Sequence, residues 1–166
     1  MHNSHPLGEI IQKNGRSERK APDVVQQLFI ITPGGKPLLN KTYSSSKFDG
    51  VLFPAFISAI CSFGKEAVGN GLDQMKFGNM LVSIKRGKEV IGIFVSHFCL
   101  TCANLGECFW VTSALSAIVD GFERQFSPLP KTPDLDLFNE FLGAIDGIID
   151  HHSSLPRPVA GLCFLD

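Results

Sequence analysis

The sequence lacks two features that would point to a class of partner: an excess of one charge, and a long apolar run. Its 166 residues hold 15 Lys and Arg against 16 Asp and Glu, a formal net charge of -1. Non-specific nucleic-acid binding needs a broad basic face, so nucleic acid is not an expected partner. No apolar run is long enough to cross a bilayer, and residues 1–20 are too polar for a signal peptide. We expect a cytoplasmic protein with at most peripheral membrane contact.

Cysteine is too scarce and too unevenly placed for a disulfide framework. The five cysteines are an odd set without a secretory context, and several lie in strongly apolar segments. We therefore expect reduced and mostly buried thiols at Cys61, Cys99, Cys102, Cys108 and Cys163.

Catalytic signatures are also missing. The stretch "TPGGK", Thr32 to Lys36, has the glycines and lysine of a phosphate-binding loop, but that loop requires a helix to begin at the lysine and a Ser or Thr after it. Here Pro37 and a β-like run follow. The stretch predicts a hairpin turn in which Gly34 and Gly35 take the turn positions. There is no nucleophile elbow either, so we expect neither an enzyme nor a cofactor.

One group of soft ligands leaves an alternative open. His97, Cys99, Cys102 and Cys108 are spaced H-x-C-x₂-C-x₅-C, which permits a metal- or small-ligand-responsive sensor site. However, structural zinc sites place paired ligands on two separate knuckles, whereas Cys108 falls in the first turns of a predicted helix. Buried thiols at a strand-to-helix junction are the competing interpretation, and we predict no metal ligand here.

The order of predicted elements is ββαβββαα, which indicates an α+β fold. Residues 1–24 have the composition of a flexible tail, residues 25–150 form one domain, and residues 151–166 form a second tail. The first two strands form a hairpin and the last three a meander, so the two sets join only by pairing strand one with strand five. This predicts a five-stranded antiparallel sheet in the order 2-1-5-4-3, with one helix between strands 2 and 3 and two helices at the C-terminal end.

The amino-acid sequences of three segments resemble those of a known group of domains. The segments "LFIITPGGKPLLNKTY", "FPAFISAICSFGKEAVG" and "QMKFGNMLVSIKRGKEVIGIFV" are similar to the longin and roadblock-related domains, over about residues 27–150. The resemblance implies a profilin-like fold, in which helices pack on a five-stranded sheet. It also implies a non-enzymatic module that dimerises or docks a protein partner in small-GTPase regulation or membrane trafficking.

The first helix carries more apolar surface than a sheet covers. At about 100° per residue, one stripe is expected to face the sheet: Leu52, Phe56, Ala59, Ile60, Phe63 and Ala67. A second set extends the apolar arc to about 180° and is predicted to bind the partner: Phe53, Ile57, Cys61, Gly64 and Val68. Residues 159–166, "VAGLCFLD", are the alternative cover for this flank.

Overall fold

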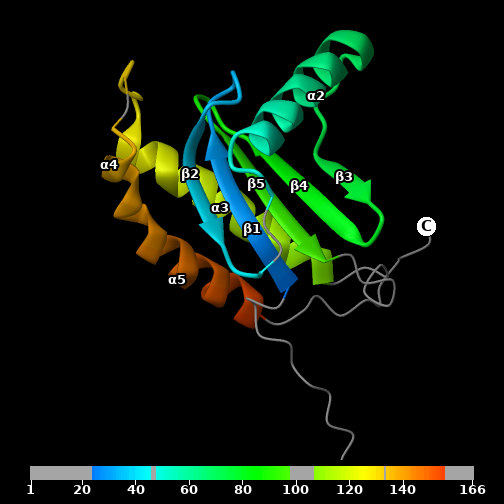
Figure 1. The fold of residues 1–166 in the computed structure, drawn as a ribbon. Helices are drawn as coiled ribbons and strands as arrows, with labels where there is room; N and C mark the ends of the chain where they lie inside the picture. Colours follow the sequence, from blue (N-terminus) through cyan, green and yellow to red (C-terminus); the bar gives the residue numbers. More distant parts are fainter. Residues whose placement is uncertain (1–23, 46–47, 98–106, 133, 156–166) are drawn as a thin grey trace, which may run out of the picture.

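The computed structural model describes residues 24–45, 48–97, 107–132 and 134–155 (Figure 1). Five strands and four helices occur along these residues in the predicted order, except that the last predicted helix is divided in two. In chain order they are β1 (Val25–Ile31), β2 (Pro37–Thr42), α2 (Leu52–Val68), β3 (Gln74–Phe77), β4 (Met80–Arg86), β5 (Ile91–His97), α3 (Glu107–Phe126), α4 (Asp136–Asn139) and α5 (Phe141–Ser154).

The five strands form one antiparallel sheet in the order β2-β1-β5-β4-β3, as predicted from the sequence. The β1–β2 hairpin and the β3–β4–β5 meander meet along β1 and β5, where Phe29 pairs with Ile93. Two edge strands result, β2 at one side of the sheet and β3 at the other. The α+β class and the strand order are therefore confirmed.

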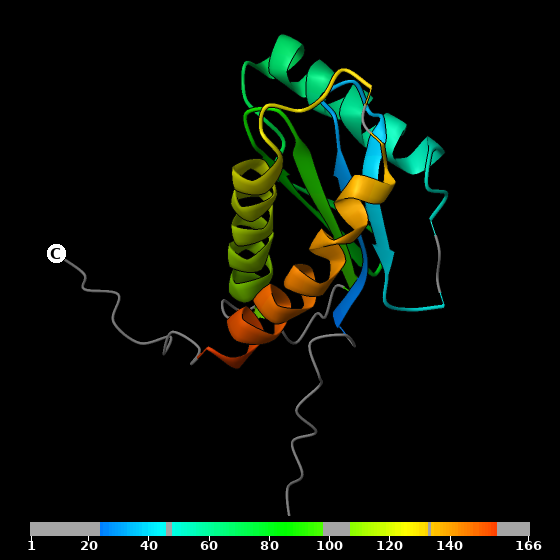
Figure 2. The ribbon, with the colours of Figure 1, turned by 90° about the vertical axis from the view of Figure 1, so that its left-hand side faces the viewer.

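Both faces of the sheet are covered by helices, and successive residues of the central strands are apolar, so that each face has its own apolar side chains. Leu28 and Ile30 of β1 pack with α3 and α5, and Phe29 and Ile31 pack with α2 on the other face. Figure 2 shows the three layers, with α3 and α5 on one side of the sheet and α2 on the other. Side chains of a strand point alternately to opposite faces, so one strand supplies both cores.

α3 approaches β5 closely because Gly92 has no side chain. A Cβ at this glycine would meet the side chains of Val119 and Leu115 on α3. The apolar face of α3 lies in this contact, and its residues Val111, Leu115, Ile118, Val119 and Phe122 are all buried.

The last predicted helix is divided in two. α4 ends at Asn139 and α5 begins at Phe141, with Glu140 between them. α5 then continues to Ser154, past the expected boundary at residue 150. Within the described ranges, no helix has the length and apolar character that a membrane span requires.

Candidate functional site

The glycine-rich stretch at residues 32–36 forms the tight turn between β1 and β2. Gly35 N–H donates to the carbonyl oxygen of Thr32, and Thr32 N–H donates to that of Lys36, both at 2.9 Å. Gly35 has φ 84°, a left-handed conformation that favours glycine. β2 follows the turn at once, so Lys36 does not open a helix whose N–H groups would face a phosphate.

This turn holds α2 against the sheet. Ser58 Oγ donates a 2.6 Å hydrogen bond to the carbonyl oxygen of Pro33. A Cβ at Gly35 would lie 3.0 Å from Ala55 Cα and 3.1 Å from Ser58 Cβ, so the backbone of the turn nearly touches the helix. The hairpin turn thereby fixes which side of α2 faces inward.

The inner side of α2 packs on the sheet with small and branched side chains. Ile57 and Cys61 are fully buried in the core formed with β1, β4 and β5. Phe53 is half-buried, and its ring centroid lies 5.6 Å from that of Phe29 and 4.6 Å from that of Phe48.

The expected orientation of this helix is therefore wrong. Leu52, Phe56 and Phe63 were expected to face the sheet, but they are 72 %, 47 % and 70 % exposed. Ile57 and Cys61, expected on the uncovered flank, take the buried positions instead. The small side chains at 58 and 61 let α2 approach the sheet more closely than a stripe containing two phenylalanines would.

The C-terminal end of α2 extends past the strands (Figure 1). Val68 is 71 % exposed, and Gly64 is partly buried. By helical periodicity, Val68 lies towards the side that carries Ile57 and Cys61. Val68 is exposed because α2 extends beyond the strands at this point.

The exposed phenylalanines of α2 continue onto the edge strand β3. The ring centroids of Phe56 and Phe77 lie 6.4 Å apart, and Phe77 is itself 36 % exposed. We call Leu52, Phe56, Phe63 and Phe77 the outer α2 surface. Exposed large apolar side chains that lie near one another are typical of interaction sites.

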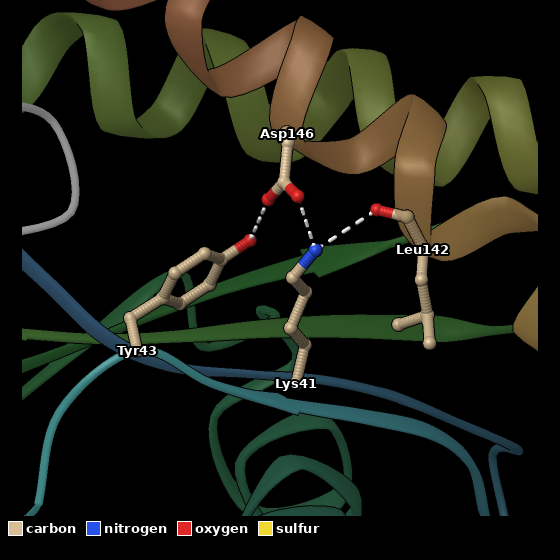
Figure 3. A network of polar contacts seen from close by, with 4 residues as sticks. All are labelled: Lys41, Tyr43, Leu142 and Asp146. Atoms are coloured by element: carbon tan, nitrogen blue, oxygen red, sulfur yellow. Dashed lines mark hydrogen bonds and ion pairs between the residues drawn. The ribbon is translucent and has the colours of Figure 1, made fainter.

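The opposite edge of the sheet carries a polar network that joins β2 to α5 (Figure 3). Lys41 Nζ lies 2.6 Å from Asp146 Oδ2 and donates to the carbonyl oxygen of Leu142 at 3.0 Å. Tyr43 donates its hydroxyl to Asp146 Oδ1 at 3.1 Å.

This network is an anchor between two elements. Burial, followed by the negative charge of Asp146, raises the pKa of Tyr43 far above its ordinary value of 10.0, so the phenol stays protonated. Sequence reasoning missed this network, because its partners are separated by more than a hundred residues and no local pattern links them.

The predicted alternative site at His97 is described only in part. His97 ends β5, is exposed, and has its Nε2 2.7 Å from Nε2 of Gln26. Cys99 and Cys102 lie outside the described residues, as does the side chain of Cys108. No group of three or more His, Cys, Asp or Glu residues suited to a metal ion occurs in the described part of the chain.

Comparison with known proteins gives structural neighbours and no sequence match. No protein-family model matches the chain, and no curated protein sequence matches it. A structure of the gliding protein MglB from Thermus thermophilus is 9 % identical, with a TM-score of 0.40 over 45 % of this chain and 63 % of that one. This chain therefore spans less than two thirds of that structure.

Two further solved structures are similar. A Roadblock/LC7 domain from Streptomyces avermitilis is 13 % identical, with a TM-score of 0.46 over 62 % of this chain and 85 % of that one. A structure of MglB with a tetrameric arrangement is 12 % identical, with a TM-score of 0.44 over 60 % of this chain and 81 % of that one. At these identities the likeness is one of architecture, and the argument for function rests on the outer α2 surface.

Proposed function

We propose that this protein is a non-enzymatic interaction module that docks a protein partner on the outer α2 surface. The observation that carries the proposal is the exposure of Leu52, Phe56 and Phe63 on a helix whose opposite side already packs on the sheet. Bulky apolar side chains left in water gain free energy when a partner covers them. Aromatic residues are also enriched among those that contribute most to binding.

The partner class that we propose is a subunit of a small-GTPase regulatory or membrane-trafficking assembly in the cytoplasm, or a second copy of this chain. Support comes from the resemblance of the sequence to longin and roadblock-related domains and from the predicted sheet order. Of the residues first predicted to bind the partner, Val68 and the partly buried Phe53 and Gly64 lie at the margin of the proposed surface. Ile57 and Cys61 lie on the other side of α2, where they are buried against the sheet.

Binding to purified small GTPases, loaded with GDP or with a GTP analogue, tests the proposal. Phe63→Glu places a charge on the outer α2 surface and is expected to abolish binding. Leu137→Glu is the control, because Leu137 is another exposed large apolar residue and belongs to α4, which packs with α5 and β2. GTPase binding that survives Phe63→Glu and fails with Leu137→Glu would move the docking site to the α4 region.

A further inference from the structure

We infer that one end of the sheet is a second interaction surface, which binds a membrane face that carries anionic phospholipids. This inference goes beyond the proposed function, because it concerns the turns at the end of the strands rather than the outer α2 surface. Five exposed cations form this surface, which we call the basic end: Lys36, Arg86, Lys88, Arg124 and Lys131.

The register of the sheet places two of its turns at this end. Ile31, the last residue of β1, pairs with Ile91, the first residue of β5. Ile91 also pairs with Arg86, the last residue of β4. The β1–β2 turn with Lys36 and the β4–β5 turn with Lys88 therefore leave the sheet at the same end.

Two glutamates bring the connection between α3 and α4 to the same place. Glu123, near the end of α3, accepts hydrogen bonds from Glu89 N–H at 2.7 Å and Val90 N–H at 3.2 Å. Glu89 in turn accepts hydrogen bonds from Leu129 N–H at 2.8 Å and from the hydroxyl of Ser127. Figure 2 shows the β4–β5 turn and this connection close together at the top. The cations that lie near these glutamates in the sequence are thereby gathered around one turn.

The cations of the basic end keep their charge available. Within the described ranges, none of the five forms an ion pair. The two carboxylates that lie among them, those of Glu89 and Glu123, already accept hydrogen bonds from the protein. A cluster of unpaired cations gives the surface a positive potential that attracts an anionic partner. Each Lys or Arg held close to an anionic bilayer strengthens binding about five-fold.

The backbone N–H groups of the two turns are largely satisfied within the protein. Thr32 N–H and Gly35 N–H donate to carbonyl oxygens of the β1–β2 turn, and Lys36 N–H donates to Thr32 Oγ1 at 3.1 Å. In the other turn, Gly87 N–H donates to the carbonyl oxygen of Val90. A peptide that adds to a strand, or a phosphate held by N–H groups, requires free donors. An anionic membrane face requires only the side-chain charges, and it is therefore the partner that these groups favour.

Exposed prolines lie beside the cations. Pro33 is in the β1–β2 turn, and Pro128 and Pro130 are in the connection between α3 and α4. Proline has no N–H, so its ring enters the headgroup layer without leaving a donor unpaired. Binding of a protein to a membrane surface strengthens with buried apolar area as well as with attraction to anionic lipids.

Co-sedimentation of the full chain with lipid vesicles tests the inference. We expect binding to vesicles of phosphatidylcholine mixed with phosphatidylserine, little binding to phosphatidylcholine alone, and weaker binding as the salt concentration rises. Lys88→Glu changes the charge by two units and is expected to weaken vesicle binding about 30-fold. Lys131→Glu is expected to have a similar effect from the neighbouring connection. A chain that does not bind phosphatidylserine vesicles, or that binds them equally well with both substitutions, overturns the inference.

Lys76→Glu is the matched control, because it makes the same change in net charge at another place. Lys76 is exposed and pairs with Leu81 of β4, five residues from Arg86 and so about 17 Å away along the strand. That distance exceeds the screening length of about 8 Å at physiological salt, so vesicle binding should be nearly unchanged. Equal losses with Lys76→Glu and Lys88→Glu would mean that net charge alone governs binding, which overturns the basic end as the site. Melting temperatures establish that each variant is folded.

Other sites and partners give distinct results. Residues 1–23 also contain cations, so loss of vesicle binding with Arg16→Glu and Arg19→Glu but not with Lys88→Glu would overturn the inference. Binding to polyglutamate without binding to vesicles would do so too, in favour of an acidic protein partner. Phe63→Glu is expected to leave vesicle binding unchanged, and Lys88→Glu to leave GTPase binding unchanged, so the proposed function and this inference fail separately.

Discussion

Ser58 on α2 and Pro33 in the β1–β2 turn are joined by a 2.6 Å hydrogen bond from the serine Oγ to the proline carbonyl oxygen. Ser58 is only 6 % exposed, so the hydroxyl end of this bond is shielded from water, whereas Pro33 at its other end is exposed. It connects the element whose outer surface we propose as the docking site to the turn between β1 and β2. The orientation of α2, and hence the identity of the residues that it presents, depends on this contact.

Replacement of Gly35 by Ala is expected to destabilise the protein by about 1–3 kcal/mol, because a Cβ would contact Ala55 and Ser58 and the left-handed φ is strained for alanine. Gly34→Ala is the matched control. Its Cβ would find no atom closer than 3.9 Å, so the change should stay within about 0.5 kcal/mol. Urea unfolding of the two variants measures the difference, and equal losses would contradict the close approach of turn and helix.

Ser58→Ala is expected to lower the free energy of unfolding by about 0.5–1.5 kcal/mol, because the hydrogen bond to the Pro33 carbonyl is lost. Urea unfolding again gives the value. Loosening of α2 should also raise the reactivity of the buried Cys61 thiol towards an alkylating reagent, followed by mass spectrometry of the Cys61 peptide. Unchanged Cys61 reactivity in a destabilised variant would show that the bond does not position this helix.

Tyr43 is expected to remain protonated well above pH 10 in the folded protein. Its folded pKa is raised above its unfolded value, so the folded state holds the proton more tightly. The stability contribution is complete below about pH 10 and falls as pH rises beyond it. Tyr43 is the single tyrosine of the chain, so the ultraviolet absorbance of tyrosinate reports it alone. Tyrosinate appearing near pH 10 without unfolding would contradict the Asp146 contact, and Asp146→Asn should move the titration towards that value.

Replacement by alanine is expected to lower the stability of the protein at Gly92 and to raise it at Gly143 and Gly147. Gly92→Ala should cost at least about 2 kcal/mol, because the new methyl group meets Val119 and Leu115 in the packed contact between β5 and α3. Gly143→Ala and Gly147→Ala lie inside α5 with no atom within 4 Å of the new Cβ, so each should stabilise by about 0.5–1 kcal/mol. Thermal unfolding distinguishes the signs. Destabilisation by both α5 variants would indicate that this face of α5 is covered in solution.

Asp49 is expected to make α2 sensitive to acid. Its carboxylate accepts hydrogen bonds from Leu52 N–H at 2.7 Å and Val51 N–H at 2.9 Å, and these bonds lower its pKa below the usual 3.8. The stabilisation is therefore present above about pH 4 and is lost as pH falls through the lowered pKa. Asp49→Asn keeps a capping oxygen and should lose that part of the acid dependence. The difference in unfolding free energy between the two proteins, followed from pH 6 downwards, gives the check, and parallel curves would argue against the cap.

The sequence predicted the sheet because its signals are local. Gly34, Gly35 and Gly78 punctuate the apolar runs that became β1 to β4, and both Gly35 and Gly78 adopt positive φ. The strand order then followed from chain connectivity, since a hairpin and a meander in one sheet can join only through β1 and β5. For α3, the helical periodicity of the apolar residues was sufficient to identify the buried face, because these residues form a single narrow stripe.

The same reasoning failed for α2 because its apolar arc spans about half of the helix. Periodicity established that surplus apolar surface exists, and the structure bears this out in the exposed Leu52, Phe56 and Phe63. Periodicity gave no basis for choosing which of two neighbouring stripes faces the sheet, the one that contains Phe56 or the one that contains Ile57.

The sequence by itself therefore determined the element order, the strand order and the presence of an apolar helix too broad for one sheet. Only the tertiary structure decided which side of α2 faces outward, and that the phenylalanines of α2 meet Phe77 on β3. The physical reason is that both depend on close packing between residues distant in sequence. Gly35 and Ser58 allow the Ile57–Cys61 side to approach the sheet, and the larger residues are left at the surface.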